Sequence, residues 1–170
     1  MKALILIADG FEDIEFFHLY YRLQEEGVDV TVTSIHGHTL TGQKGYRVEP
    51  DLLIRDIAHT DFDLLLIPGG TSPERLRTRE EAVGLTRSFM QEGQMVATIS
   101  HGIQLLISAG SMDARAIACS PSIRDDARAS GGRYRDEAVV VDDNLITGRS
   151  REDLPEFTAK VVELIGQRVG

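Results

Sequence analysis

Ser100 and His101 stand side by side at the end of an apolar run, within the segment Thr98-Ile99-Ser100-His101-Gly102. A strand that turns sharply into a helix exposes the side chain at its tip, and the first amides of the helix can stabilise an anion there. Hydrolases use this turn as Gly-x-Ser-x-Gly; Gly102 fits that pattern, whereas Thr98 occupies the place of the first glycine. The segment therefore predicts a nucleophile elbow at Ser100. A serine that merely caps the following helix is the alternative.

Two other segments end apolar runs with residues suited to a binding site. Asp9-Gly10-Phe11-Glu12 follows the run 3–7, and Pro68-Gly69-Gly70 closes the run 63–67. Ligands of parallel α/β sheets bind beyond the carboxyl ends of the strands. We therefore expect these two segments and Ser100 to meet at one edge of a sheet.

The alternation of apolar runs and helix-forming segments predicts the elements that position these residues. Continuous apolar runs are typical of strands buried on both faces, and spacings of three and four residues indicate helices. Such an alternation implies one α/β domain with a mostly parallel sheet covered on both sides. We expect strands at 3–7, 28–32, 63–67, 95–99 and 116–119, a hairpin at 138–147, and helices at 11–26, 80–92, 101–109, 123–129 and 153–165, with a hairpin or irregular excursion at 39–51.

Composition excludes several classes of function. The net charge of −9 speaks against nucleic-acid binding, which needs a basic face. A single cysteine, Cys119, precludes an internal disulfide and favours a reducing compartment. No cluster of cysteine and histidine suggests a metal site, and no run approaches the ~20 apolar residues of a membrane span. Because the run 3–7 is too short for a signal peptide, we expect a cytoplasmic protein.

The order of several short blocks resembles the DJ-1/PfpI superfamily over nearly the whole chain. The blocks are Phe11-Glu12-Asp13-Ile14-Glu15, Pro68-Gly69-Gly70 with Pro73-Glu74-Arg75, Ser100-His101-Gly102, Ser108-Ala109-Gly110, Ile123-Arg124-Asp125-Asp126 and Ala138-Val139-Val140-Val141-Asp142. The intracellular protease I branch is the most similar. The resemblance implies a flavodoxin-like three-layer sandwich formed by one domain over residues 1–170. It also implies homodimers or hexamers, chemistry without a cofactor, and small-molecule or peptide substrates.

The resemblance also implies roles for particular residues. Glu12 corresponds to the glutamate that hydrogen-bonds the elbow nucleophile, and His101 to the adjacent histidine. Glu74 corresponds to a carboxylate that reaches this histidine across a subunit interface. The amides of Gly70 and His101 correspond to an oxyanion hole. The alternatives are a helix N-terminal charge at Glu12, a surface acid at Glu74 and a plain tight turn at Gly70.

Cys119 and Ser120 lie in a segment that the resemblance places near the active pocket. A small cysteine in a short apolar strand is more commonly a packed core residue. We therefore expect Cys119 to be a packed core residue, and a pocket position of Cys119 and Ser120 is the alternative.

Ser100 departs from the family pattern, which has cysteine at this position. A hydroxyl needs a base in line to take its proton, whereas a thiol of pKa ~8.5 ionises readily. The resemblance implies a hydrolase or glyoxalase-type site for small carbonyl compounds (methylglyoxal or glycated molecules) or peptides. The sequence shows no matched base for Ser100, so we expect negligible turnover. The alternative is a non-catalytic stress-response or binding protein that keeps the pocket.

Overall fold

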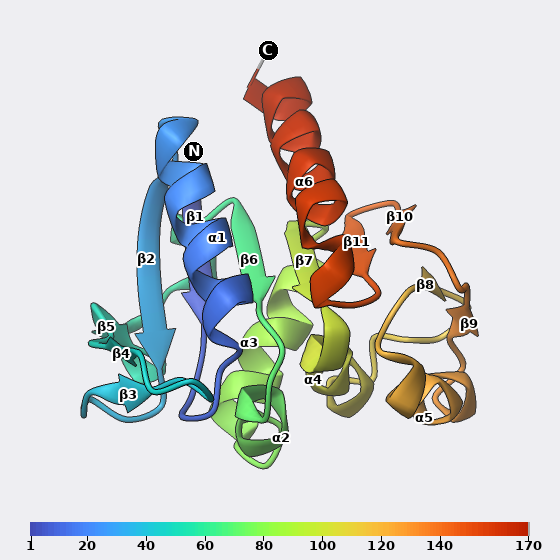
Figure 1. Ribbon diagram of the computed structural model, residues 1–170, viewed down its shortest axis with the longest axis horizontal. Coiled ribbons are helices and arrows are strands. Elements are labelled where there is room, and N and C mark those ends of the chain that lie inside the picture. The colour runs from blue at the N-terminus through green and yellow to red at the C-terminus, as the bar shows by residue number, and fades with distance from the viewer. Residues whose placement is uncertain (170) are drawn as a thin grey trace.

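The computed structural model describes residues 1–169, which form a three-layer α/β arrangement around a seven-stranded sheet (Figure 1). Every neighbouring pair in this sheet runs parallel except β10 and β11. In spatial order the strands are β10 (Val139–Asp142), β11 (Leu145–Gly148), β7 (Met95–Ile99), β6 (Leu64–Ile67), β1 (Lys2–Leu6), β2 (Asp29–Ser34) and β5 (Leu52–Leu53). The predicted flavodoxin-like α/β class is confirmed.

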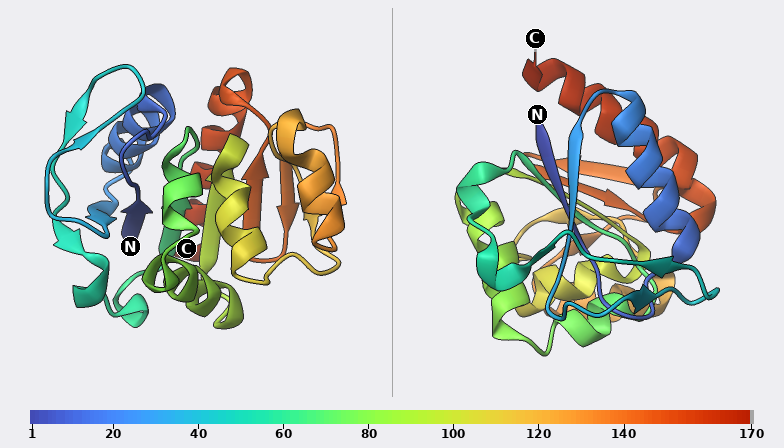
Figure 2. Two further views of the ribbon diagram at one scale, coloured as in Figure 1. Left: turned by 90° about the horizontal axis from the view of Figure 1, so that it is seen from below. Right: turned by 90° about the vertical axis from the view of Figure 1, so that its left-hand side faces the viewer.

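Helices cover both faces of the sheet because its central strands carry apolar side chains on both sides. Leu4 and Leu6 of β1 pack into one core, while Ala3 and Ile5 pack into the other. Helices α1 (Asp13–Glu25) and α6 (Leu154–Val169) lie together on one face, as the right-hand view of Figure 2 shows. The opposite core is covered by α2 (Ser72–Leu76), α3 (Glu80–Gln91), α4 (Ile103–Ser108) and α5 (Arg124–Ala129).

Two small sheets lie outside the main one. The predicted excursion at 39–51 contains the antiparallel pair β3 (Leu40–Thr41) and β4 (Arg47–Val48). The predicted strand at 116–119 is shorter, since β8 spans Ala116–Ile117 and pairs with β9 (Arg133–Tyr134). Strands of two residues carry too few side chains to show a period, so the sequence did not predict β5 and β9.

The carboxyl ends of β1, β6 and β7 meet at the lower edge in Figure 1. The segment after β7 forms a single 3₁₀ turn over Ser100–Gly102 before α4 begins, where a helix over 101–109 was expected. Helix α2 was not predicted; it begins directly after the glycine turn that closes β6. No helix within residues 1–169 is long and apolar enough to cross a membrane.

Candidate active site

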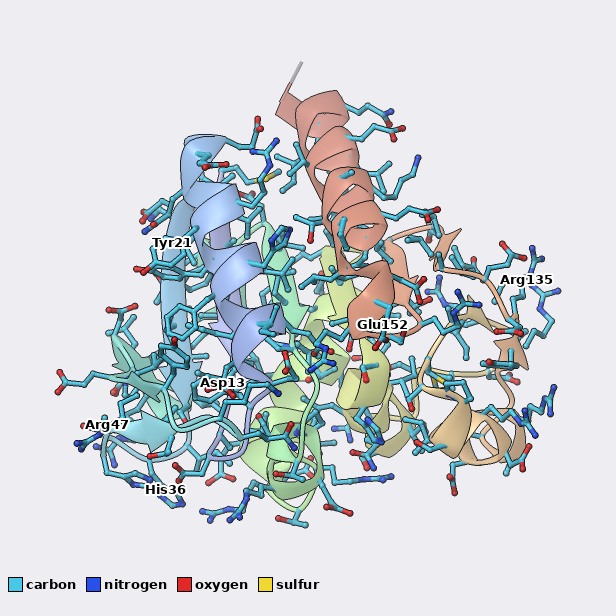
Figure 3. All side chains as sticks on the ribbon, viewed as in Figure 1. Asp13, Tyr21, His36, Arg47, Arg135 and Glu152 are labelled. Atoms are coloured by element: carbon cyan, nitrogen blue, oxygen red, sulfur yellow. The ribbon has the colours of Figure 1, made fainter. Side chains whose placement is uncertain are left out.

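The three predicted strand ends line one pocket of about 500 Å³. Of the predicted site residues, the lining includes Glu12, Gly70, Glu74, Ser100 and His101. Segment 150–152, which precedes α6, supplies another wall; Glu152 of that segment is labelled in Figure 3. The pocket also lies where the crossovers from β1 and β6 leave the sheet in opposite directions, the usual ligand position in this class of fold.

Ser100 occupies the tip of a strained turn. Its φ is 60°, a left-handed conformation that costs a residue other than glycine about 1–3 kcal/mol. The turn is tight because Gly102 lies against Ile67 and Thr98, where a Cβ atom would collide with both. Thr98, which replaces the first glycine of the hydrolase pattern, donates its hydroxyl to Ile67 O at 3.0 Å. The predicted elbow geometry is present.

The helix-capping interpretation of Ser100 is wrong. No side chain caps the 3₁₀ turn or α4. The Ser100 hydroxyl instead lies 3.4 Å from Nδ1 of His101. The side chains of Ser100 and His101 therefore face one another across the sharp turn. Their adjacency in the sequence did not predict this contact.

His101 is held between two hydroxyl groups. Its Nδ1 faces Ser100, and its Nε2 lies 3.1 Å from Oγ of Ser122. Burial lowers the pKa of His101 below its usual value of 6.5, and the negative charge of Glu74 opposes that shift. At neutral pH the imidazole is therefore mainly uncharged and able to accept a proton.

Glu12 does not hydrogen-bond Ser100 in the structure, contrary to the role that the resemblance implies. Its side chain caps α1 by accepting from the Glu15 amide at 2.8 Å. Its other oxygen faces Lys44 Nζ at 3.4 Å and Arg151 at 3.6 Å. In this arrangement both carboxylate oxygens of Glu12 are engaged by groups other than the elbow, although Glu12 lines the same pocket as Ser100.

Glu15, one helical turn later, is the carboxyl group nearest the elbow backbone. It is 1% exposed and accepts from the Gly69 amide at 2.6 Å. A Cβ atom on Gly69 would lie 2.8 Å from Oε2 of Glu15 and 3.0 Å from Cβ of Ser100. Because Gly69 has no side chain, Glu15 and Ser100 can approach one another across it. Burial raises the pKa of Glu15 to about 8, and the nearby charge of Glu12 adds to the effect.

Gly70 lines the pocket, and its amide points away from the neighbouring segment at Phe11. Gly70 and Phe11 form an antiparallel bridge in which Glu12 N donates to Gly69 O and Thr71 N donates to Gly10 O. In that pattern the bridged residue itself turns its N–H away from its partner. Gly70 adopts a φ of 82°, and a Cβ atom there would collide with Gly10 O, so only glycine fits.

Glu74 and Cys119 lie in different environments, one in the pocket and one in the core. Glu74 lies on α2 and lines the pocket of its own chain. Cys119 is fully buried in the core and does not line the pocket, and burial raises its pKa to about 12, so the thiol is not a pocket nucleophile. Ser120 is not a lining residue either, but its hydroxyl lies 2.8 Å from Ser122 Oγ.

Several residues with polar side chains in or beside the pocket escaped the sequence analysis, among them Lys44, Gln104, Ser122 and Arg151. Lys44 comes from the excursion before β4, and Arg151 from the turn before α6. Neither follows a strand that the resemblance connects with the site, so no local pattern marked them. Within residues 1–169, no group of three or more histidine, cysteine, aspartate or glutamate residues is arranged to hold a metal ion.

Comparison with known proteins gives matches over nearly the whole chain. A sequence model of the DJ-1/PfpI family matches residues 1–164. A protein of Archaeoglobus fulgidus is 46% identical over 97% of this chain and 98% of its own length. A Pyrococcus furiosus protein named Deglycase PfpI is 42% identical over 97% of this chain and 99% of its own. A solved two-domain protein from Anabaena variabilis, with DJ-1/ThiJ/PfpI-like and ferritin-like domains, superposes with a TM-score of 0.96 at 32% identity, over 98% of this chain and 50% of that one.

Proposed function

The chain belongs to the DJ-1/PfpI family, and from that premise we propose that it is a hydrolase or glyoxalase-type enzyme for small carbonyl compounds. Its substrates include 2-oxoaldehydes such as methylglyoxal and the adducts they form with amines. The name of the Pyrococcus furiosus relative, a deglycase, supports this class of substrate. Ser100 is the nucleophile.

The observation that carries the proposal is the contact between Ser100 and a neutral histidine. Ser100 Oγ lies 3.4 Å from His101 Nδ1, which is within reach of a proton transfer once substrate tightens the site. As Oγ bonds to the carbonyl carbon of a substrate, its proton passes to Nδ1 and the carbonyl π electrons move onto the oxygen. His101 is then the general base that the sequence alone did not supply.

The negative charge that develops on the carbonyl oxygen has donors nearby. Gly70 lines the pocket with its amide unbonded to Phe11 across the bridge, and the amide of His101 is the first after the nucleophile; both are the proposed donors. Because its pKa is about 8, Glu15 holds a proton at neutral pH and adds a donor instead of a second negative charge. We propose that Glu15 takes the role that the resemblance suggested for Glu12.

We expect slow catalysis at Ser100 because the group that would stabilise a protonated His101 is a weak one. Ser122 on the far side of His101 is a neutral hydroxyl, which stabilises an imidazolium less than a carboxylate does. This weakness favours the second candidate, a binding protein that keeps the pocket without turnover. We also propose a cytoplasmic, homo-oligomeric protein. The single free and buried cysteine supports the reducing compartment.

The test compares the parent chain with Ser100→Ala and Ser100→Cys on methylglyoxal and a panel of fluorogenic peptides. We expect slow methylglyoxal turnover by the parent, none by Ser100→Ala, and a rate at least ~10-fold higher for Ser100→Cys, because a thiolate needs no base. Ser130→Cys is the matched control, since it adds an exterior thiol away from the pocket. If neither the parent nor Ser100→Cys turns over any of these substrates, the result would support the binding protein instead.

A further inference from the structure

His101 contacts a serine hydroxyl at each ring nitrogen, and the two serines come from different elements. Ser100 belongs to the turn after β7, whereas Ser122 lies in the 3₁₀ turn Pro121–Ile123 that leads into α5. The two turns are fastened to one another, because Ser120 N donates to Ser100 O at 3.1 Å. The position of Ser122 relative to the imidazole is thus set by the backbone and not by a mobile loop.

We propose that Ser122 is a positioning residue that holds His101 as the Nε2–H tautomer and so leaves the Nδ1 lone pair facing Ser100. Ser120 completes the arrangement by accepting a hydrogen bond from the Ser122 hydroxyl. This inference deepens the proposed function of the Ser100 site and rests on it only for its catalytic consequence. The tautomer itself exists whether or not a substrate is turned over.

The count of donors and acceptors favours this direction of the hydrogen bonds. A neutral imidazole has one N–H, and a hydroxyl has one donor and two acceptor sites. Ser122 can donate to Ser120 at 2.8 Å and still accept from Nε2 at 3.1 Å. In the opposite direction, Ser122 would donate to Nε2, and the ring proton would have to lie on the longer 3.4 Å contact with Ser100.

No carboxylate bonds to His101 within the described chain. Glu74 lines the same pocket and acts on the imidazole through its charge, without a hydrogen bond to it. In a Ser-His-Asp triad a carboxylate engages the ring nitrogen on the side away from the nucleophile, which is Nδ1. Here the nitrogen on that side is Nε2, and a hydroxyl engages it. A hydroxyl whose own proton is donated elsewhere, as that of Ser122 is to Ser120 in this arrangement, acts only as an acceptor at the ring nitrogen and so selects the tautomer as a carboxylate would.

The first test observes the ring nitrogens of His101 by ¹⁵N nuclear magnetic resonance on the uniformly labelled, full-length protein near pH 7.5. His101→Gln identifies the signals. We expect Nδ1 of the parent at the position of an unprotonated nitrogen and Nε2 at that of a protonated one. In Ser122→Ala the separation between the two shifts should shrink, since both tautomers then become populated.

Two further variants separate positioning from structure. Ser122→Thr keeps the hydroxyl and should restore the separation of the shifts. Ser130→Ala should leave the signals unchanged, because the Ser130 hydroxyl bonds to Asp126 O within α5. Ser122 is exposed, so its replacement by alanine leaves the core intact.

Three results would overturn the inference: a protonated Nδ1 in the parent, unchanged signals in Ser122→Ala, or a failure of Ser122→Thr to restore them. If Glu74→Gln shifts the signals where Ser122→Ala does not, the carboxylate is the positioning group. In an active parent, Ser122→Ala should lower kcat and leave KM nearly unchanged. An Nε2–H tautomer in a parent without turnover would refute the proposed function and uphold the role of Ser122.

Discussion

At the scale of single residues, the buried carboxyl of Glu15 couples the site to pH. Its pKa is about 8, raised chiefly by burial from an ordinary value near 4.5. Between these two values the folded protein keeps a proton that the unfolded chain has released. The unfolded state therefore binds fewer protons, and the free energy of unfolding falls as the pH rises from about 4.5 to about 8.

Glu15→Gln should remove this pH dependence. Each pKa unit corresponds to about 1.4 kcal/mol, so the parent should lose a few kcal/mol of stability between pH 5 and pH 8 that the variant retains. The glutamine oxygen can still accept from the Gly69 amide, so the local bond survives. Urea unfolding at pH 5 and pH 8 measures the difference, with the exposed Glu25→Gln as control. Equal pH slopes for parent and Glu15→Gln would contradict the assignment.

The positions of the candidate site residues were predictable where they follow a buried strand. Ser100, His101 and Gly70 stand at strand ends, and the topology brings such ends together in any parallel sheet. Glu12 and Glu15 are three residues apart on one helix, and both reach the pocket. Only the capping bond of Glu12 decides between them, and that bond depends on where α1 begins. Ser122 was not predictable, because its contact with His101 joins two separate turns.

At the scale of elements, the turn that exposes Ser100 does so with a strained backbone conformation at that residue. A left-handed residue other than glycine is strained, whereas glycine adopts this conformation freely. Ser100→Gly should therefore be more stable than Ser100→Ala by about 0.5–1 kcal/mol, after the larger chain entropy of glycine in the unfolded state is included. Both variants lack the nucleophile, so their comparison isolates the backbone.

The matched control for the elbow is Ser130, whose φ of −86° suits any residue. There the order should reverse, with Ser130→Ala more stable than Ser130→Gly. Thermal unfolding of the four variants, followed by circular dichroism, gives the comparison. A Ser100→Ala variant at least as stable as Ser100→Gly would show that the turn carries no strain.

Elements with long apolar patterns were predicted well, and short ones were not. The run 63–67 became β6, and the spacing over 80–92 became α3, since burial on one or both faces fixes such patterns. Helix α2 has only five residues, and β8 and β9 have two each. Contacts with the elbow and with α5 stabilise α2 and the short strands. These contacts join residues far apart in the sequence, so a local sequence pattern does not predict them.

At the scale of the whole molecule, α1 presents an apolar face that no other part of the described chain covers. Ile14 and Tyr21 on this helix and Tyr46 beside it are among the most exposed large apolar side chains, with 47–62% of their surface accessible. Tyr21, labelled in Figure 3 at the left-hand side of α1, lines a surface pocket together with Ile14 and Tyr46. Acidic and basic side chains, including Arg22 and Glu25, border the same face.

A face with both signs of charge beside exposed aromatic rings is suited to a second copy of the same chain. A two-fold axis through this face would bring each of its side chains to the matching face of the partner, so groups of both signs are available to pair across it. We therefore expect the parent to sediment as a dimer or a larger homo-oligomer at micromolar concentration, and Tyr21→Glu to sediment as a monomer. Glu74→Ala tests the sequence-based expectation that Glu74 lies at a subunit contact, and it should lower the assembly state if the contact is there.

The control for the sedimentation experiment is Val141→Glu. Val141 is also exposed, at 42%, but it lies on the edge strand β10 at the opposite end of the sheet from β2 and β5 (Figure 1). The added charge there should leave the sedimentation coefficient unchanged, because the proposed contact is confined to the α1 face. If the parent sediments as a monomer, the expected dimer and the expected role of Glu74 across an interface would both be wrong. Dissociation by Val141→Glu with no effect of Tyr21→Glu would instead move the contact to β10.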